Sequence, residues 1–422
     1  MTATEPGVRY RRLARRARVK RAASRLLAPG LLLLLGLARR SVWRRARVVT
    51  VIGSFGKTTT THAVTAALGL PLTWWSETGR NAYSSLPLNT LWQLARYGEA
   101  VVEVGIGSPG QMGRYASALR PDIVVLTGLG SDHLPSFRDR SHLWAEKARM
   151  LAALRDGGVV LVNADDQNAV EHAARASSRI LGFGFGAGAE VRGVGWRAEP
   201  GPASVLSVSV DGRRLEIRSR LPTRTSCRAL LAGLAAALVS ERDLDPAATD
   251  MAAVASVRGR LEPRPLPNGA VALNDTYKGT FETVVAALTD FVELPARRRL
   301  LLLGELETPP DGRRSYREVG RLLASGIDRI FLVGVGTTRL SVYRAAARRA
   351  GLDADRVEAV ADVQDAIERL RPELSAGDLL LVKGRSSQRL ERVIKGLAGV
   401  EVSCRLRTCG LDVQRCKDCP LL

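Results

Sequence analysis

The sequence predicts an α/β protein with parallel sheets, and two observations support this fold class. Apolar runs at residues 48–52, 100–106, 122–129 and 158–165 alternate with segments of helical character. A second series of apolar runs follows residue 261. Alternation of this kind is typical of a mostly parallel sheet with helices on both faces. A chain of 422 residues has room for two or three such domains.

The N-terminal arm, residues 1–47, has a composition unlike the rest of the chain. Residues 6–47 hold fourteen Arg or Lys and no acid, which accounts for two-thirds of the net charge of +21. The apolar run at 26–37 has twelve residues, fewer than the about 20 that span a bilayer. No small-residue cleavage site follows it.

We therefore expect residues 9–47 to associate with an anionic membrane surface, as an interfacial helix or as a short hairpin at Pro29-Gly30. A disordered basic tail is the alternative. Nucleic-acid binding is the weakest interpretation, because the arm offers one Tyr and one Trp for stacking on bases.

The stretch from Val48 to Val64 has the pattern of a phosphate-binding loop. A β-branched run ends at Gly53, and Gly56-Lys57-Thr58 opens a segment that can be helical. Glycines let backbone N–H groups turn toward a phosphate, and the helix N-terminus adds partial positive charge. In such a loop the lysine reaches the terminal phosphates and the threonine hydroxyl binds Mg²⁺. The expected ATP-binding residues are Gly53, Ser54, Gly56, Lys57, Thr58 and Thr59.

After the first parallel strands, the chain shows features that complete one domain and begin another. A Gly-rich stretch at 182–202 precedes an alternating run that breaks at Asp211-Gly212, which predicts a β-hairpin. A helical stretch at 230–239 closes the domain, and further strands are expected at 270–277, 298–306, 329–336 and 377–385. We expect the boundary at 257–261. The predicted parts are the arm 1–47, a central P-loop ATPase domain 48–258, a smaller Rossmann-like C-terminal domain 259–400 and a Cys-rich tail 401–422.

Three polar residues outside the loop are candidates for the chemistry. Glu103 ends an apolar strand, where a carboxylate is costly unless it meets a cation, so we interpret it as a Mg²⁺ ligand. His133 follows the end of another strand, where it can face the ligand-binding crevice of a parallel sheet, but a structural role is equally compatible with this position. Lys147 lies in a predicted helix and, taken alone, would be a solvated surface lysine.

Seven segments together resemble the ATP-dependent Mur ligases, in family order from residue 48 to about 396. The later segments look most like the D-Ala-D-Ala-adding type. The matching segments are GSFGKTTTT, NAYSSLPLNTLW (81–92), VVEVGIGSPGQM, RPDIVVLTGLGSDHL followed by AEKARML, VRGRLEP (257–263), NDTYKGTFET (274–283) and GDLLLVKGRSSQRLERV (377–393).

The resemblance assigns a role to each matching position. It implies that Lys57 and Thr58 hold the ATP phosphates and Mg²⁺, and that Glu103 and His133 are metal ligands. Lys147 matches the lysine that is carbamylated and braces a second Mg²⁺. The remaining matches are Asn163 on the nucleotide side, the hinge residue Arg260 that reaches the phosphates on domain closure, Asp275 at the nucleotide, and Lys383 in the C-terminal substrate motif.

The implied activity is carboxylate–amine ligation through an acyl phosphate, on a cell-wall or related peptide precursor at the inner face of the membrane. The chain departs from the family in having only 47 residues before the phosphate strand, where the family has a domain that binds the UDP-sugar. A lipid-linked substrate is therefore an alternative. A poly-γ-glutamate-type synthetase or a lipid-II-amidating subunit with a partner protein is a further alternative. A non-ligating assembly factor that uses ATP as a switch, or a tethered ATPase, would belong to another class.

Four of the five cysteines lie in the last nineteen residues, as Cys404, Cys409, Cys416 and Cys419. The spacing C-x₄-C-x₆-C-x₂-C predicts a structural Zn²⁺ site or an iron–sulfur cluster. Four reduced thiols on a frayed tail are the alternative. The tail is not part of the family resemblance.

Overall fold

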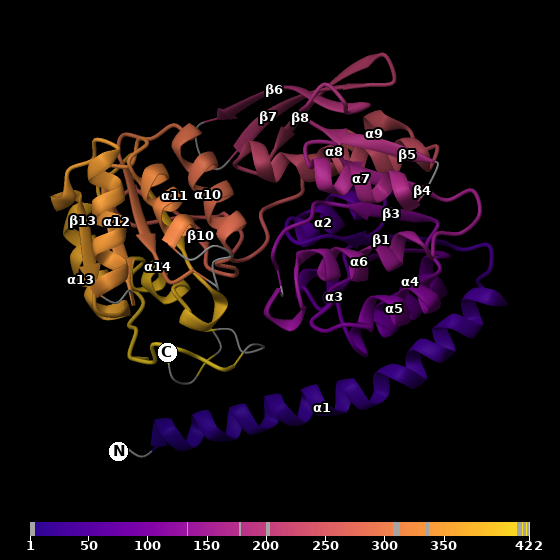
Figure 1. Ribbon diagram of the computed structural model, residues 1–422, viewed down its shortest axis with the longest axis horizontal. Helices are drawn as coiled ribbons and strands as arrows, with labels where there is room; N and C mark the ends of the chain where they lie inside the picture. The colour runs from indigo at the N-terminus through magenta and orange to yellow at the C-terminus, as the bar shows by residue number, and fades with distance from the viewer. Residues whose placement is uncertain are drawn as a thin grey trace. The chain divides into compact units, whose positions relative to one another are not determined.

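The computed structural model describes residues 5–132, 134–176, 179–199, 203–306, 313–334 and 337–411, with residues 416, 419 and 422 (Figure 1). The chain divides into two units. The first unit comprises residues 22–255. The second comprises residues 256–422 together with residues 1–21.

The first unit contains an eight-stranded sheet with the order β2-β1-β3-β4-β5-β6-β7-β8. Neighbouring strands are parallel from β2 to β6, and β7 and β8 continue the sheet antiparallel. The four strands predicted first along the chain are confirmed. The strands are β1 (Arg47–Ile52), β2 (Glu99–Glu103), β3 (Ile123–Leu126), β4 (Val159–Asn163), β5 (Ile180–Gly184), β6 (Val191–Glu199), β7 (Ala203–Val210) and β8 (Arg213–Ser219).

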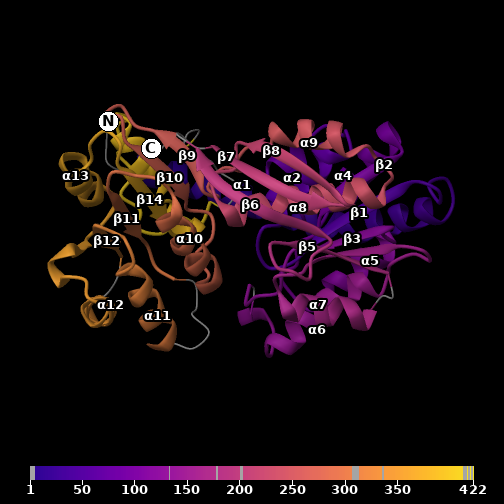
Figure 2. The same cartoon turned by 90° about the horizontal axis from the view of Figure 1, so that it is seen from above.

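Helices cover both faces of this sheet (Figure 2). Because strand side chains alternate, Val49 and Val51 of β1 pack with α2, α8 and α9, while Val48 and Ile52 pack with α5, α6 and α7. The helices are α2 (Lys57–Ala67), α3 (Trp74–Glu77), α4 (Ser85–Tyr97), α5 (Gln111–Leu119), α6 (Arg140–Leu151), α7 (Gln167–Ala176), α8 (Arg224–Val239) and α9 (Leu244–Ala252), with a 3₁₀ turn η1 (Leu134–Ser136).

The predicted hairpin is confirmed as β7 and β8. Its turn residues Asp211 and Gly212 both have positive φ, 49° and 70°, as a two-residue hairpin turn requires. The preceding Gly-rich stretch was not predicted to contain a strand, yet it forms β6. A Cβ at Gly193 would lie 2.5 Å from the ring of Phe185, so the glycine there permits close packing.

Residues before β1 form one helix, α1 (Glu5–Arg40), which Figure 1 shows as continuous. The predicted alternative of a hairpin at Pro29-Gly30 is therefore wrong. Pro29 is exposed, so water can solvate the carbonyl that its missing N–H leaves unpaired, and the surrounding Leu, Ala and Arg favour helix. Within the described residues, one helix, spanning 10–40, is long and apolar enough to cross a membrane, and one such N-terminal helix is weak evidence of a span.

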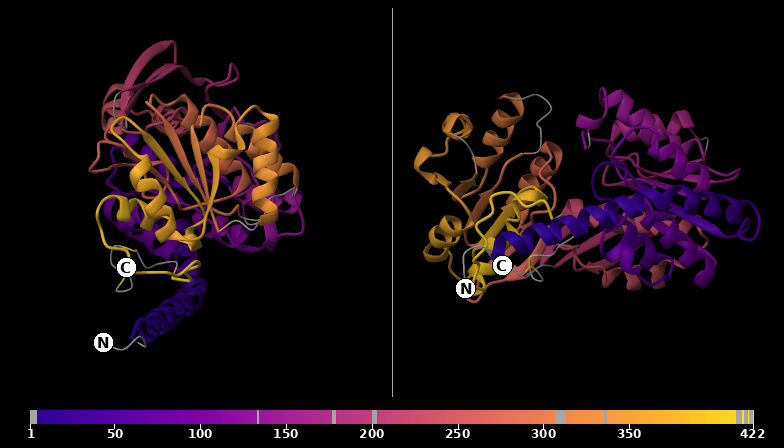
Figure 3. Two further views of the ribbon diagram at one scale, coloured as in Figure 1. Left: turned by 90° about the vertical axis from the view of Figure 1, so that its left-hand side faces the viewer. Right: turned by 90° about the horizontal axis from the view of Figure 1, so that it is seen from below.

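The second unit contains a six-stranded sheet with the order β13-β12-β11-β14-β10-β9, parallel except for β9 (Figure 3, left). Its four predicted strands are confirmed, whereas the four-residue strands β9 and β13 were not predicted because both are short and carry charges. The elements are β9 (Glu262–Pro265), β10 (Val271–Asp275), α10 (Phe281–Glu293), β11 (Arg299–Leu303), α11 (Arg313–Leu323), β12 (Arg329–Val333), α12 (Thr337–Arg349), η2 (Ala354–Arg356), β13 (Val357–Val360), α13 (Val363–Glu373), β14 (Leu379–Lys383), η3 (Ser386–Gln388) and α14 (Glu391–Leu397).

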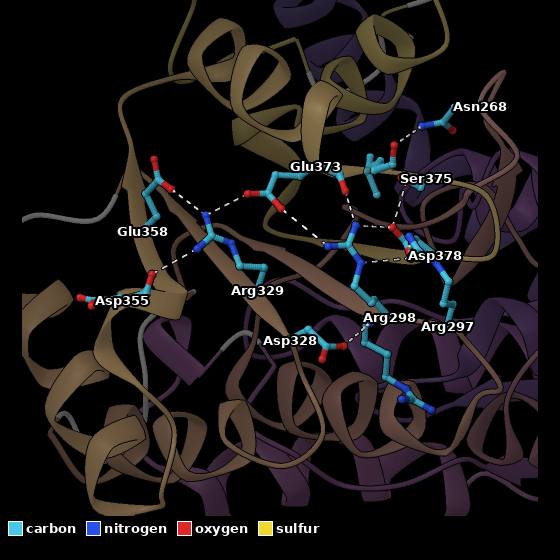
Figure 4. A network of polar contacts seen from close by, with 12 residues as sticks. Asn268, Arg297, Arg298, Asp328, Arg329, Asp355, Glu358, Glu373, Ser375 and Asp378 are labelled. Carbon is cyan, nitrogen blue, oxygen red and sulfur yellow. Dashed lines mark hydrogen bonds and ion pairs between the residues drawn. The ribbon is translucent and has the colours of Figure 1, made fainter.

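Ion pairs hold the amino edge of the second sheet together (Figure 4). Asp378, just before β14, accepts hydrogen bonds from Arg298 at 2.7 Å and from the backbone N–H of Ser375 at 3.0 Å. Arg297 lies 2.9 Å from the same carboxylate. Arg329, at the start of β12, pairs with acids of neighbouring elements. This network joins strands β11, β12 and β14 where they begin.

Candidate active site

The turn between β1 and α2 has the geometry of a phosphate-binding loop. Gly53 has φ 141°, and a Cβ there would lie 2.2 Å from the Thr127 hydroxyl, so only glycine fits. Gly56, with φ 76°, directly precedes the first turn of α2. The helix therefore points free N–H groups and its positive end toward the carboxyl edge of the sheet, where ligands of parallel sheets bind.

Lys57 and Thr58 lie in the first turn of α2. The Nζ of Lys57 donates to the Gly53 carbonyl at 3.0 Å and lies 4.0 Å from Asp132, so it folds back over the loop. Thr58 is buried, and its Oγ1 has no hydrogen-bond partner among the described residues. Thr59 is half-buried in the same turn. A buried hydroxyl without a partner costs free energy unless a ligand satisfies it.

Glu103 is the last residue of β2, next to Val51 of β1 in the sheet register. Its side chain is buried, and Oε1 accepts a hydrogen bond from the Asn81 amide at 2.6 Å. Its Oε2 has no partner in the part of the chain that the structure describes. A buried carboxylate oxygen in this state suits a hard cation such as Mg²⁺.

Lys147 is a buried residue and not the solvated surface lysine that its helix pattern alone suggests, which agrees with the site position that the family resemblance implies. Helix α6 places it in the interior, 3% exposed, with Nζ donating to the hydroxyl of Ser54 at 2.6 Å. The same hydroxyl accepts from the backbone N–H of Gly130 at 2.7 Å. Ser54 is thus the residue through which the loop, the segment after β3 and α6 meet.

Asn163 ends β4 at the same sheet edge. It is buried, and its amide donates to the Thr127 carbonyl at 3.1 Å. Thr127 in turn donates to the Phe55 carbonyl in the loop at 2.6 Å. Asn163 therefore supports the loop through Thr127. His133 lies outside the described residues, so its predicted metal role stays a prediction.

In the second unit, the predicted residues gather at the carboxyl edge of the sheet. The guanidinium of Arg260 stacks on the Tyr277 ring, 4.5 Å from its centroid. Asp275 and Lys383 end the adjacent strands β10 and β14 and form a buried ion pair, Oδ2 to Nζ, at 2.7 Å. Lys383 also donates to the Lys278 carbonyl at 2.7 Å. Both side chains are thus engaged with the protein itself.

A cavity of about 200 Å³ lies at the same edge of the second sheet. Its walls include Glu305 after β11, Asp362 after β13, and Arg385 after β14. Arg385 and Glu305 pair at 2.7 Å. The tail residues Arg405 and Arg407 also line the cavity. Charged groups of both signs therefore surround the cavity.

Three residues of the first-unit site were not singled out from the sequence. Asn81 binds Glu103, Thr127 supports the loop, and Asp132 faces Lys57. Asn81 begins one of the resembling segments and Asp132 precedes His133, so both had a local signal. Thr127 also lies in a resembling segment, but its support of the loop depends on the pairing of β1 with β3, which no local pattern shows.

The cysteine tail is bound to the second unit by Arg392. This buried arginine donates to the carbonyls of Cys404 and Leu406, each at 2.7 Å, and to the Cys404 Sγ at 3.1 Å. Burial, together with nearby Glu391, raises the pKa of the Cys416 thiol to about 12. No group of three or more His, Cys, Asp or Glu that could hold a metal ion occurs among the described residues.

Comparison with known proteins identifies the class of both units. Residues 51–237 match the Mur ligase middle domain, and residues 259–386 match the Mur ligase, glutamate ligase domain. The chain belongs to the Mur ligase family and is an ATP-dependent ligase.

Among curated proteins, the chain is similar to the UDP-N-acetylmuramoyl-tripeptide--D-alanyl-D-alanine ligases of Bacillus subtilis and Escherichia coli. The B. subtilis protein is 25% identical over 355 residues, which cover 83% of this chain and 76% of the relative. The E. coli protein is 24% identical over 378 residues, covering 83% and 77%.

Solved structures show the same fold. The MurF ligase from Thermotoga maritima in complex with ADP has a TM-score of 0.72 at 19% identity, covering 87% of this chain and 83% of that one. Mycobacterium tuberculosis folylpolyglutamate synthase has a TM-score of 0.63 at 18% identity, covering 90% and 99%.

Proposed function

We propose that this ligase joins the carboxylate of a peptidoglycan-type peptide precursor to the amine of an amino acid or short peptide, with ATP and Mg²⁺. The observation that supports this most is the pair of buried oxygens, Thr58 Oγ1 and Glu103 Oε2, which have no hydrogen-bond partner among the described residues. Both lie beside the phosphate loop. Hydroxyl and carboxylate oxygens are the ligands that Mg²⁺ takes beside nucleotide phosphates.

The side chains around this site suit transfer of a phosphoryl group, because such a reaction depends on positioning and charge neutralisation. Bound Mg²⁺ would neutralise phosphate charge. The Nζ of Lys57 already lies over the loop at the Gly53 carbonyl, and in the proposed site it would bind the terminal phosphate oxygens. Asn81 orients Glu103, and Ser54 orients Lys147. The roles predicted for His133, Arg260 and Asp275, and carbamylation of Lys147, stay predictions.

In the proposed reaction, a substrate carboxylate oxygen attacks the γ-phosphorus and ADP leaves. The amine then attacks the carbonyl carbon of the acyl phosphate, loses a proton and displaces inorganic phosphate. One amide bond forms for each ATP that is split. We propose that the amine substrate binds at the cavity beside the loop after β14, whose charged lining can hold a zwitterion.

The test is phosphate release and product analysis with purified protein and Mg-ATP. UDP-N-acetylmuramoyl-tripeptide with D-Ala-D-Ala is the first pair, because the curated relatives bear that name. Lipid-linked precursors and single amino acids follow. We expect phosphate release to require both an acid and an amine, and mass spectrometry to show the condensed product. Phosphate release without an amine or a new amide would contradict ligation and favour an ATP-driven switch.

Replacing Lys147 separates these outcomes further. We expect Lys147→Ala to lower ligation by about 10³-fold, comparable to the loss of other preorganised charged groups in active sites. Arg140→Ala, an exposed position at the start of the same helix, is the matched control and should keep full activity. A Lys147→Ala protein that ligates like wild type would remove Lys147 from the site.

The location of the reaction is part of the proposal. We infer that the ligase works in the cytoplasm at the inner face of the membrane, which the basic and apolar arm supports. A partner protein stays a prediction.

The metal predicted for the tail also stays a prediction. A protonated thiol such as that of Cys416 is a poor ligand, since metals bind the thiolate. Elemental analysis of the purified chain for zinc and iron checks the prediction, and one equivalent of either metal that is lost in a Cys404→Ser/Cys409→Ser variant would support it.

A further inference from the structure

Helix α1 presents two different faces along residues 26–37. Ala28, Leu32 and Leu35 are buried, and the last two belong to the core on one side of the first sheet. Five leucines lie on the opposite side of the helix and are exposed, with 81% for Leu26 and 66% for Leu33. The exposed leucines are Leu26, Leu27, Leu33, Leu34 and Leu37. We call these five residues the leucine face.

The buried side of the helix is fixed by Arg39. Its guanidinium donates to the carbonyls of Trp43, Ala46, Leu119 and Arg120, at 2.7 to 2.9 Å, and to Asp122 at 3.1 Å. The side chain is 2% exposed. A buried guanidinium with this many partners is costly to detach, because each partner would be left unpaired.

Other contacts hold the helix along its length. The hydroxyls of Ser24 and Ser84 lie 2.7 Å apart, and the Arg25 guanidinium stacks over Tyr83 at 5.1 Å. At Gly36, a Cβ would lie 3.6 Å from the Ala118 backbone, which shows how closely the helix approaches α5. Residues 24 to 39 are therefore bound to the surface of the first unit by one side, and the leucine face points away from it.

This arrangement distinguishes a helix that spans a membrane from one that binds parallel to its surface. A spanning helix exposes its whole circumference to lipid or to other membrane segments, so its side chains cannot at the same time be buried in a domain outside the membrane. Spanning would here require Leu32, Leu35 and Arg39 to leave the first unit. Binding parallel to the surface requires no such change, since the leucine face is already exposed. The length of α1 alone therefore does not indicate a span.

Charge on both sides of the leucine face favours lipid as its occupant. Arg11, Arg12, Arg15, Arg16 and Arg18 precede it along α1, Arg44 and Arg45 follow it, and all are exposed. Residues 6–47 contain no acid, so a second copy meeting the same face would bring two strongly cationic arms together. An anionic leaflet offers both the apolar layer and the counter-charge.

We propose that the leucine face of α1 docks in the plane of an anionic bilayer while its opposite side stays bound to the ligase domain, so that the first-unit site is carried on the membrane surface. This deepens the proposed location and rests on it, but does not depend on which bond the ligase forms. Docking of this kind would suit a substrate that is itself held by a lipid.

The test compares purified full-length wild type with Leu26→Glu/Leu33→Glu/Leu37→Glu in sedimentation with phosphatidylglycerol-containing and pure phosphatidylcholine vesicles. We expect wild type to bind the anionic vesicles, less strongly at high salt, and the triple variant to lose about 100-fold or more in partitioning. Val194→Glu, which adds a charge at a half-exposed apolar position on β6, is the control and should bind like wild type.

Three results would overturn the proposal. The first is equal vesicle binding by wild type and the triple variant. The second is a wild-type dimer in light scattering that the triple variant abolishes, which would make the leucine face a contact between copies. The third is resistance of the membrane-bound protein to alkaline carbonate, which would indicate a span. Ligation of soluble substrates by the wild-type protein is measured alongside. If wild type binds the vesicles but forms no amide product, the proposed function is contradicted and the docking proposal is not.

Discussion

The two parallel sheets differ at their carboxyl edges. In the first unit, Thr58 and Glu103 each present a buried oxygen without a hydrogen-bond partner in the described residues. In the second unit, Asp275 and Lys383 at the strand ends satisfy each other. A polar group that the protein leaves unsatisfied is costly, so the ends of β1 and β2 suit a ligand, whereas the ends of β10 and β14 are closed by their own ion pair. The cavity lined by Glu305 and Arg385 lies at the other strands of the second edge.

The amino edges, by contrast, are alike. Asp122 before β3 accepts from Arg39, Arg155 and the Val48 backbone N–H. Asp378 before β14 is held by Arg297 and Arg298 in the same way. Through these hydrogen bonds and ion pairs, each carboxylate links the first residues of neighbouring strands. At the amino edges a paired carboxylate joins the strands, whereas the carboxyl edges hold the unpartnered oxygens of the first unit, among the described residues, and the cavity of the second.

The largest expected effect comes from breaking the buried ion pair between Asp275 and Lys383. Lys383→Met leaves Asp275 buried and unpaired, and we expect it to lower the free energy of unfolding by about 3–5 kcal/mol. Asp275→Asn/Lys383→Met, which removes both charges, should recover most of this loss. Urea denaturation measures both variants. If the single variant is as stable as wild type, Asp275 and Lys383 do not form a structural pair in solution.

Removing the unpartnered hydroxyl of Thr58 should have the opposite effect on stability, while it lowers activity. Thr58→Val removes an oxygen that has no hydrogen-bond partner in the described part of the chain. Without nucleotide we therefore expect stability to stay equal or to rise, by up to about 1–3 kcal/mol. Ligation should fall by about 10²-fold if the proposal is right, because the proposed Mg²⁺ ligand is lost. Thr58→Ser is the matched control and should keep activity. A marked loss of stability in Thr58→Val would show that the hydroxyl has a structural partner.

The smallest effect concerns the amino edge of the second sheet at acid pH. Burial by itself raises the pKa of Asp378, but the hydrogen bond from Arg298 and the other positive neighbours bring it below the ordinary value of 3.8. Between the folded pKa and 3.8 the unfolded chain binds more protons. The contribution to stability is therefore complete above this window and is lost as the pH falls through the folded pKa.

Thermal unfolding of wild type and Asp378→Asn between pH 3 and 7 checks this expectation. The difference in stability between the two proteins should shrink as the pH falls below about 4. A difference that stays constant across the range would mean that Asp378 does not titrate with folding.

Many residues of the candidate site could be predicted from the sequence because they belong to short local motifs. The glycines and Lys57-Thr58 follow a strand directly, so the loop geometry depends on a few adjacent residues. Glu103 was predicted as a ligand for a similar reason, since a carboxylate that ends an apolar strand needs a partner. Lys147 looked like an ordinary surface lysine on its helix until the family resemblance was considered.

The sequence by itself determined the eight central strands of the two parallel sheets, the phosphate loop and the family, because periodicity, turn residues and motif spacing are local properties. Only the tertiary structure decided that Lys147 is buried against Ser54, that Asp275 meets Lys383, and that α1 stays bound through Arg39 with its leucines outward. Each of these contacts joins residues far apart in the chain. Their energetics depend on burial and on which partners the fold brings within reach, and no local pattern specifies either.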